Sequence, residues 1–244
     1  MKFVVIIPAR YQSSRLSGKP LIKLKGVSMI VRTYRQCIKA VSKKLVYVAT
    51  DDSRIRDECL SNKIKVIMTP KRCLTGTDRV FEASKKIKAD TYINVQGDEP
   101  LFNPNDLKKL IKAIRKYPKD VITGYCEIFD KKKYQDVNVP KVVVSEDGHI
   151  LYASRAPIPS NRKNKFVQAW RQVCAYAFPK KKLHLFAKKK RKTKLEGIED
   201  LEYLRFLELG VKLRALKMSR KSIAVDTKEN VHTVSKFINK YRKI

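Results

Sequence analysis

The sequence predicts an α/β protein with a mixed, mostly parallel sheet flanked by helices, which is a Rossmann-like architecture, and with a β-rich insertion. In the first half of the 244-residue chain, short apolar runs alternate with amphipathic helical patterns. Repeated β-α units of this length join parallel strands. The first run, residues 3–7, lacks polar alternation, which is typical of a strand buried on both faces. In the middle of the chain, strand-like runs follow one another directly, and this predicts the insertion.

In the first half of the chain, local patterns predict each element. We expect strands at residues 3–7, 45–50, 64–68 and 92–96. We expect helices at residues 29–41, 53–60 and 78–87, with apolar side chains on one face. A further helix begins after Asn103, because asparagine is a good N-cap and Pro104 suits the first helical position.

The second half is less regular. Strands are expected at residues 121–128, 141–144 and 150–154, joined by polar turns such as 146–148, and a β-rich insertion therefore covers about residues 120–180. Segments of this kind often lie where subunits meet or where a substrate lid forms. We expect a helix at 195–209 ended by Gly210, a strand at 212–218 and a closing helix at 227–241. No firm domain boundary is visible, so residues 1–244 are expected to form a single domain.

The charge balance is extreme. Lysine and arginine number 56 and aspartate and glutamate 23, which gives a net charge of +33. Such a charge raises non-specific affinity for polyanions and favours anionic substrates. The lysines are spread over the polar faces of the helices. The densest cluster, residues 188–192, fits a solvated helix end and loop, with a nucleic-acid or membrane-surface patch as the alternative. No zinc-finger, RNA-binding aromatic or basic heptad pattern occurs, so no specific nucleic-acid partner is expected.

The cysteines and the hydropathy pattern predict the compartment. The five cysteines contain no CxxC pair and lie within or beside apolar runs, as free buried thiols of a reducing compartment do. The first residues are a strand and not a signal peptide, and no apolar stretch approaches the length of a membrane span. A soluble, cytoplasmic protein with no membrane span is expected.

A basic loop follows the first strand. It carries Arg10, Arg15 and Lys19 together with Ser13 and Ser14. Ligands of open α/β sheets bind beyond the carboxyl ends of the strands. Cations and free backbone N–H groups at this edge suit a polyphosphate, although a solvated basic loop is the alternative in so basic a protein.

Two acidic segments are expected at the same edge. Asp98 follows the strand at 92–96 and stands beside Gly97, where a carboxylate can hold Mg²⁺ close to nucleotide phosphates. Asp226 precedes the last helix. Each has a structural alternative, because Asp98 can cap a surface turn, and Asp226 with Glu229 resembles a capping box.

The remaining patterns exclude some enzyme classes. Thr75, Gly76 and Thr77 begin a helix and suit either a nucleoside or a plain capped turn. There is no GxGxxG and no Walker A sequence, which argues against dinucleotide enzymes and P-loop NTPases. No histidine lies in a nucleophile context, so a hydrolase triad is not expected.

Six motifs resemble a known family. IIPARYQSSRLSGKPL, VATDD, TGTDR, NVQGDEP, LYASRAPIP and AVDTKEN recur in this order in the 3-deoxy-manno-octulosonate (Kdo) cytidylyltransferases, and the resemblance covers almost the whole chain. It implies a nucleotide-diphospho-sugar transferase fold and a homodimer. It also implies that Mg²⁺ and CTP are used to make a CMP-activated sugar acid for lipopolysaccharide or capsule.

The resemblance also assigns residues. Arg10, Arg15, Lys19 and Asp98 would be catalytic, and Asp98 with Asp226 would bind the metal. The nucleotide side would be formed by Pro8, Ala9, Arg10, Arg15, Lys19, Thr75, Gly76 and Thr77. The sugar-acid side would be formed by Arg79, Gln96, Arg155, Gln172, Tyr176 and Glu202, with Arg155 either at the pocket or in its supporting shell.

The chain departs from the family pattern on the sugar-acid side. Where the family has a histidine in an RHxGIYGY-like motif, this chain has Gln172, and where it has glutamine in LEQLR, this chain has Tyr203. Tyr176 and Glu202 are kept. The altered side chains pair different substrate hydroxyls, and an unpaired buried polar group weakens binding. The identity of the sugar acid is therefore open.

The resemblance implies nucleotidyl transfer from CTP to a 3-deoxy-2-ulosonic acid, with release of pyrophosphate. Kdo is the first candidate for the acid, and 8-amino-Kdo or a nonulosonic acid is the alternative. A non-catalytic, basic nucleic-acid-binding protein is the remote alternative, and it predicts tight, salt-dependent binding of DNA or RNA without release of pyrophosphate.

Overall fold

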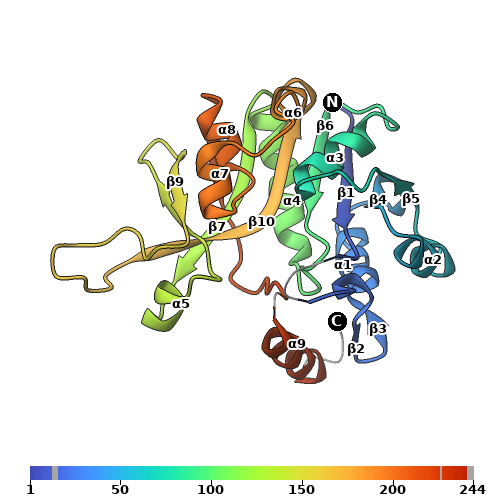
Figure 1. The fold of residues 1–244 in the computed structure, drawn as a ribbon, viewed down its shortest axis with the longest axis horizontal. Helices are drawn as coiled ribbons and strands as arrows, with labels where there is room; N and C mark the ends of the chain where they lie inside the picture. The colour runs from blue at the N-terminus through green and yellow to red at the C-terminus, as the bar shows by residue number, and fades with distance from the viewer. Residues whose placement is uncertain (13–15, 226, 241–244) are drawn as a thin grey trace.

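A nine-stranded sheet forms the centre of the computed structural model, which describes residues 1–12, 16–225 and 227–240 (Figure 1). Its strands are β1 (Phe3–Ala9), β4 (Val46–Thr50), β5 (Val66–Met68), β6 (Thr91–Val95), β7 (Val121–Ile128), β8 (Lys141–Val144), β9 (Ile150–Ser154), β10 (Ala169–Pro179) and β11 (Leu213–Lys217). The order along the sheet is β11-β7-β10-β6-β1-β4-β5, and β8 and β9 extend from β10. Most neighbours along this order are parallel, and β10 is antiparallel to both of its neighbours. The predicted mixed, mostly parallel sheet is confirmed.

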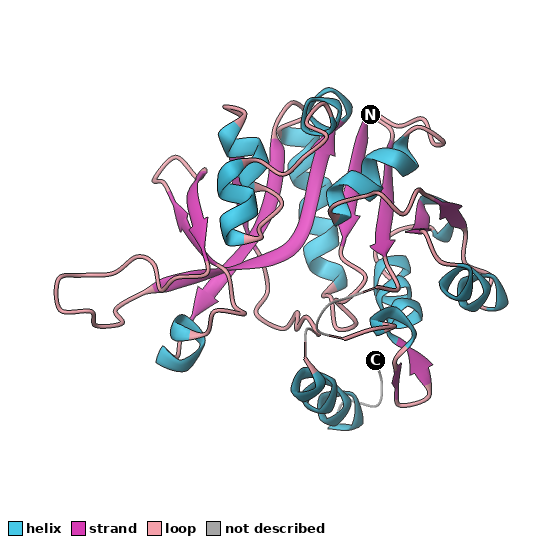
Figure 2. Cartoon of the chain, viewed as in Figure 1, coloured by secondary structure: helices cyan, strands magenta, loops and turns pink. Residues whose placement is uncertain are grey.

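Helices cover both faces of the sheet (Figure 2). The helices are α1 (Met29–Ile38), α2 (Ser53–Ser61), α3 (Gly76–Ser84), α4 (Pro104–Lys116), α5 (Lys131–Gln135), α6 (Lys180–Ala187), α7 (Lys194–Glu199), α8 (Leu204–Glu208) and α9 (Lys228–Lys240), with short 3-10 turns η1 (Lys19–Leu21) and η2 (Lys43–Leu45). One core contains buried side chains of α1, α2 and α4, and the other contains those of α3, α6 and α8. As predicted, Asn103 caps α4, because its side chain accepts a hydrogen bond from the N–H of Asn105. None of the helices in the described ranges combines the length and apolarity that a bilayer span requires.

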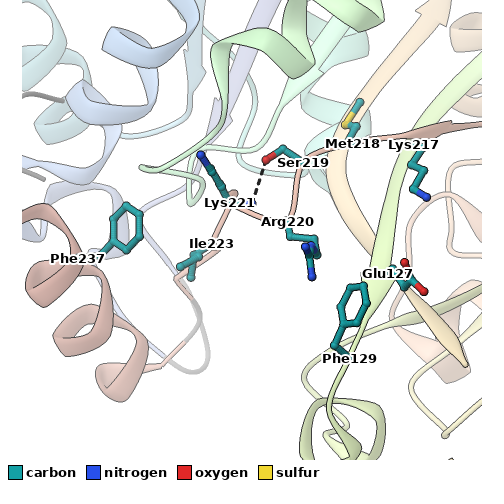
Figure 3. A pocket seen from close by; sticks show the side chains of 9 residues that line it. All are labelled: Glu127, Phe129, Lys217, Met218, Ser219, Arg220, Lys221, Ile223 and Phe237. Atoms are coloured by element: carbon teal, nitrogen blue, oxygen red, sulfur yellow. Dashed lines mark hydrogen bonds between the residues drawn. The ribbon is translucent and has the colours of Figure 1, made fainter. Parts of the chain in front are cut away.

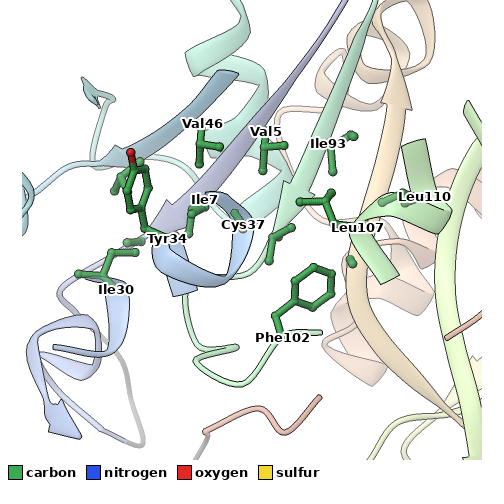
Figure 4. Packing of buried hydrophobic residues seen from close by; sticks show 14 of the residues in the cluster. Val5, Ile7, Ile30, Tyr34, Cys37, Val46, Ile93, Phe102, Leu107 and Leu110 are labelled. Carbon is green, nitrogen blue, oxygen red and sulfur yellow. The ribbon is translucent and has the colours of Figure 1, made fainter. Parts of the chain in front are cut away.

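β1 is buried on both faces, as its unbroken apolar run predicts. Val5 and Ile7 belong to the core under α1 and α4, and Figure 4 shows them packed with the side chains of these helices. Val4 and Ile6 belong to the core on the opposite face. Successive side chains of a strand point to opposite faces, so a central strand covered on both sides has to be apolar throughout.

A third cluster joins the end of the chain to its beginning. Val234 and Ile238 of α9 pack with Leu24 of the small hairpin β2 (Lys23–Leu24) and β3 (Val27–Ser28). Val225 is buried in the same cluster. The expected closing helix is therefore present, and it covers the chain just after the basic loop.

Several elements were not expected from the sequence, among them the hairpin β2–β3, the short helix α5, β10 and α6. β10 is eleven residues long, and α6 follows it directly. β10 carries Arg171 and Gln172 inside its run, and its pairing with β7 shifts register between Val173 and Tyr176. This irregularity interrupts the two-residue alternation by which a strand is recognised.

The single helix expected at residues 195–209 is wrong, because the chain forms α7 and α8 with a break between them. Asp200 adopts a left-handed conformation, with φ of 51°. The break returns α8 onto α7, where the guanidinium of Arg205 donates to both carboxylate oxygens of Glu196 at 2.7 and 2.6 Å. Gly210 follows α8 with φ of 70°, in the left-handed conformation expected after a helix end.

The β-rich middle of the chain is part of the main sheet. β8 pairs with the first residues of β10, and β9 pairs with β8. The loop between β9 and β10 extends away from the body of the molecule (Figure 1). All five cysteines are free, as expected. Cys37, Cys59 and Cys126 are buried, whereas Cys73 and Cys174 are half-buried, so the expectation of buried thiols is wrong for these two.

Candidate functional site

The ends of β1 and β6 lie against each other at one edge of the sheet. Pro8 and Ala9 end β1 and are buried, and Gly97 follows β6. A Cβ atom on Gly97 would lie 2.8 Å from the carbonyl oxygen of Pro8, so a larger residue would push the two strand ends apart. The hydroxyl of Thr33 donates to the Gly97 carbonyl at 3.2 Å and ties this junction to α1.

The basic loop and the acidic turn after β6 meet at this edge. The Lys19 ammonium lies 2.6 Å from a carboxylate oxygen of Asp98. Gly18 directs Lys19 there, because it has φ of 66° and its N–H donates to the Tyr11 carbonyl at 2.9 Å. Arg10 is exposed at the start of the loop, and Arg15 lies outside the described residues. The sequence placed Lys19 and Asp98 at the same edge, and the structure brings them into contact.

The last acidic segment also reaches Asp98. The N–H of Val225 donates to the carbonyl of Asp98 at 2.9 Å. Asp226, the next residue in the sequence, lies outside the described residues, so its predicted role stays a prediction. Within residues 1–12, 16–225 and 227–240, no three histidine, cysteine, aspartate or glutamate side chains gather as a ready-made metal site.

Glu202 joins the turn that begins α3 to the residue after β6. Its carboxylate accepts hydrogen bonds from the N–H of Thr77 at 2.9 Å and from the side-chain amide of Gln96 at 2.8 Å. Burial raises the pKa of Glu202 above its ordinary value. A Cβ atom on Gly76 would lie 2.6 Å from the Gln96 amide, so a larger residue there would displace the Gln96 side chain. Thr75 caps α3 in a capping box, as its structural alternative predicted.

Gln172, Tyr176 and Tyr203 form a buried polar group on the side of Glu202. The amide of Gln172 donates to the hydroxyl of Tyr176. The rings of Tyr176 and Tyr203 lie 6.2 Å apart, and burial raises the pKa of both phenols well above the usual value. Among the described residues, the Tyr203 hydroxyl has no hydrogen-bond partner. The two positions that depart from the family pattern therefore both contact Tyr176.

The two arginines expected on the sugar side are held by protein groups. Arg79 is buried and donates to Asp51 at 2.9 Å and to the hydroxyl of Thr69 at 2.6 Å. Arg155 donates to the carbonyl of Glu199 at 2.6 Å, and the Arg155 N–H donates to the Glu199 carboxylate at 2.8 Å. These contacts fit a supporting role for Arg155, and substrate binding by Arg79 stays a prediction.

Sequence reasoning missed the acidic partners of these arginines. Asp51 lies in the VATDD motif, directly after β4, which was a signal that could have been used. Glu199 ends α7 at the break before α8, where a continuous helix was expected, and Glu202, which the resemblance did assign, lies in the same break. The contact of Glu202 with Thr77 spans 125 residues of sequence, so no local pattern reports it.

The fold and this edge together define an α/β enzyme that handles a nucleotide. A cationic loop after the first strand faces a carboxylate after its neighbour, as a polyphosphate with a metal ion requires. The chain belongs to the cytidylyltransferase family of nucleotidyltransferases, whose family model matches residues 4–219.

Individual relatives agree with this placement. The chain is 38% identical to a 3-deoxy-manno-octulosonate cytidylyltransferase of Chlorobium phaeobacteroides, over 98% of each chain. It is 36% identical to an 8-amino-3,8-dideoxy-manno-octulosonate cytidylyltransferase of Shewanella halifaxensis, over 95% of this chain and 96% of the relative. The solved structure of a CMP:2-keto-3-deoxy-manno-octonic acid synthetase complexed with CTP superposes with a TM-score of 0.91 at 34% identity, covering 99% of this chain and 100% of the other.

Proposed function

We propose that the protein transfers the CMP group of CTP to a 3-deoxy-2-ulosonic acid. The anomeric hydroxyl oxygen of the acid bonds to the α-phosphorus in line, the bond from this phosphorus to the bridging oxygen breaks, and pyrophosphate leaves. The hydroxyl proton passes to solvent water as the bond forms. The observation that carries the proposal is the meeting of Lys19 with Asp98 at the ends of β1 and β6, in a chain of the cytidylyltransferase family.

The basic loop supplies the charge that this reaction needs. Negative charge develops on the departing pyrophosphate, and cations held close to it stabilise the transition state more than the bound substrate. Arg10, Arg15 and Lys19 are proposed for this role. The carboxyl end of β1 and the turn that begins α3 are proposed to hold the cytidine. The residues are Pro8, Ala9, Thr75, Gly76 and Thr77.

The residues at the sheet edge fit a Mg²⁺ ion. Mg²⁺ takes one or two protein carboxylates and fills its other positions with phosphate oxygens and water. Asp98 supports this assignment, because its carboxylate already contacts a cationic group and its side chain is 27% exposed, within reach of a ligand. Asp98 and Asp226 are proposed to hold the ion. When bound, Mg²⁺ would lower the pKa of the attacking hydroxyl and neutralise charge on the phosphates.

The sugar acid is proposed to bind beside Glu202, Gln96 and Tyr176, with Gln172 close by. Arg79 is proposed to contact the acid, and Arg155 to support the pocket. Kdo is the first candidate, and its 8-amino derivative is the alternative, because relatives named for each acid are similarly close to this chain. A nonulosonic acid is the remaining alternative. Tyr203 and Gln172 would contribute to the choice among them.

A panel assay tests the proposal. The purified protein would be incubated with CTP, Mg²⁺ and one acid at a time, and products would be identified by mass spectrometry. We expect a CMP-sugar and an equal amount of pyrophosphate with Kdo or 8-amino-Kdo. Omission of the acid serves as the control. If none of the acids gives a CMP-sugar and the protein binds DNA tightly in a salt-dependent way, the nucleic-acid alternative would be favoured.

We further propose a cytoplasmic homodimer that supplies lipopolysaccharide or capsule synthesis. Exposed apolar side chains in the β-rich middle support a subunit contact there: Phe129, Val137, Leu151 and Val167 are each at least 59% exposed. Light scattering coupled to size-exclusion chromatography tests the dimer. Phe129→Ser and Val137→Ser together should shift the mass toward the 28.3 kDa of one chain.

A further inference from the structure

Residues 219–225, which we call the strap, follow β11 and end at Val225. Part of the strap lines a pocket with Glu127 and Phe129, and Figure 3 shows Arg220, Lys221 and Ile223 around it. A segment with a pocket on one side has fewer packing contacts to fix it. Hydrogen bonds from α4, β10 and the turn after β6 therefore matter for its position.

Asp106 holds the beginning of the strap. Both carboxylate oxygens accept the N–H of Ser219, at 3.0 and 2.9 Å. The side chain is fully buried, and the ammonium of Lys109 lies 3.6 Å away. Burial of a carboxylate is unfavourable unless it makes specific contacts, and burial raises the pKa of Asp106. The site proposed above does not use the Asp106 carboxylate. Its contact with Ser219 therefore accounts for the presence of a buried carboxylate here.

Arg171 and Ser222 hold the middle of the strap. The guanidinium of Arg171, on β10, donates to the Ser222 carbonyl at 2.9 Å and to the Arg220 carbonyl at 3.4 Å. The hydroxyl oxygen of Ser222 accepts the N–H of Asn103, the N-cap of α4, at 3.1 Å. The strap is thus tied both to the start of α4 and to the strand that carries Gln172.

The end of the strap is fixed on Asp98. Val225 is buried in the cluster with α9, and its N–H donates to the Asp98 carbonyl at 2.9 Å. The strap therefore ends in contact with the turn that carries Asp98, a predicted metal ligand.

We propose that the strap holds the turn that carries Asp98 in the position that a divalent ion requires, and that Asp106 and Arg171 are the positioning residues that hold the strap. The inference rests on the proposed function for the metal assignment. It adds residues that do not touch the metal or substrate and act through the strap. Supporting groups of this kind commonly change metal affinity about 10- to 100-fold.

Calorimetric titration of CTP with and without Mn²⁺ tests the proposal, with Mn²⁺ as the probe for the divalent site. The ratio of the two CTP affinities isolates the contribution of the metal. Asp106→Leu and Arg171→Met should each lower this ratio about tenfold, while the affinity for CTP alone stays within about twofold. Asp106→Asn keeps an oxygen acceptor for Ser219 and should restore most of the ratio.

Hydrogen exchange adds a readout that does not involve the metal. The amides of Ser219 and Val225 should exchange faster in Asp106→Leu than in the wild type, while those of β1 stay protected. Arg214→Met is the matched control. It removes an arginine that contacts Asp120 at 2.6 Å, at the opposite end of β11, and it should leave both the strap and the metal contribution unchanged.

The outcomes separate this inference from the proposed function. A wild-type protein whose CTP affinity does not respond to Mn²⁺ would refute the metal assignment and this inference with it. A normal Mn²⁺ contribution in folded Asp106→Leu or Arg171→Met would overturn the role of the strap alone. If Asp106→Leu does not fold, Arg171→Met, whose side chain is only half-buried, decides the question.

Discussion

Glu202 is a half-buried carboxylate that holds two separate segments, through Thr77 and Gln96. Burial raises its pKa, and the hydrogen bond from the Thr77 N–H opposes part of this rise. The folded protein therefore binds the Glu202 proton more tightly than the unfolded chain does. The contribution of this group to stability is largest at low pH and falls as the pH rises from the ordinary value of 4.5 through the raised pKa.

Substitution of Glu202 by glutamine should remove this pH dependence. The melting temperature of Glu202→Gln relative to the wild type should rise with pH across that window, because only the wild type has to ionise a buried group. Thermal unfolding of both proteins over a pH series measures the difference. A difference that is constant with pH would contradict the raised pKa.

Asp98→Asn should stop turnover and spare nucleotide binding. The amide keeps the shape of the side chain but loses the charge that faces Lys19 and the proposed metal. We expect the rate of pyrophosphate release to fall by about a hundredfold or more, with CTP affinity largely kept. Asp57→Asn, at an aspartate that is 61% exposed on α2, is the control. Near-normal activity of Asp98→Asn would refute the proposal that Asp98 binds the metal.

At the scale of elements, the close approach of β1 and β6 depends on a residue without a side chain. Alanine at position 97 would place its Cβ 2.8 Å from the backbone oxygen of Pro8, which cannot move without moving β1. Gly97→Ala should lower the free energy of unfolding by about 1–3 kcal/mol and reduce activity, because both strand ends carry site residues.

Urea unfolding compared with Gly197→Ala measures this effect. Gly197 lies in α7, and an added Cβ there would have no atom within 4 Å. Because alanine favours a helix, this control should gain about 0.5–1 kcal/mol. Equal effects of the two substitutions would show that the junction of β1 and β6 is not close-packed.

The sequence predicted the regular elements better than the irregular ones. β7, β8 and β9 have the predicted bounds, since each is a short, mostly apolar run bounded by polar turns. β10 was missed because its polar residues and its shifted register hide the alternation. The break between α7 and α8 was missed because it depends on Arg205, whose carboxylate partner Asp78 is 127 residues away.

The candidate site was predictable only as a set of segments at one sheet edge. A strand end followed by charged residues is visible in the sequence, and this placed Lys19 and Asp98 together. The contacts of Glu202 and Asp106 are tertiary, and no local pattern contains them.

At the scale of the molecule, the net charge of +33 is spread over exposed lysines, and residues 188–191 after α6 are exposed as expected. Distributed charge attracts polyanions without selecting a sequence. Binding to short duplex DNA should therefore weaken by about tenfold or more between roughly 50 and 200 mM salt and should be equal for unrelated sequences. Fluorescence anisotropy with two labelled duplexes measures this. A marked preference for one duplex would contradict non-specific attraction.

The packing of α9 against Leu24 and Met29 has a consequence for synthesis of the protein. Val234 and Ile238 leave the ribosome after almost all other core residues, yet they complete the cluster that contains Val225. A nascent chain can pair β1 with β4 and β6 early, but this cluster stays open until the last helix has emerged. The sheet edge that carries Lys19 and Asp98 is therefore expected to reach its final structure only at the end of translation. A chain that lacks α9 would keep most of its sheet, but its candidate site would be incomplete.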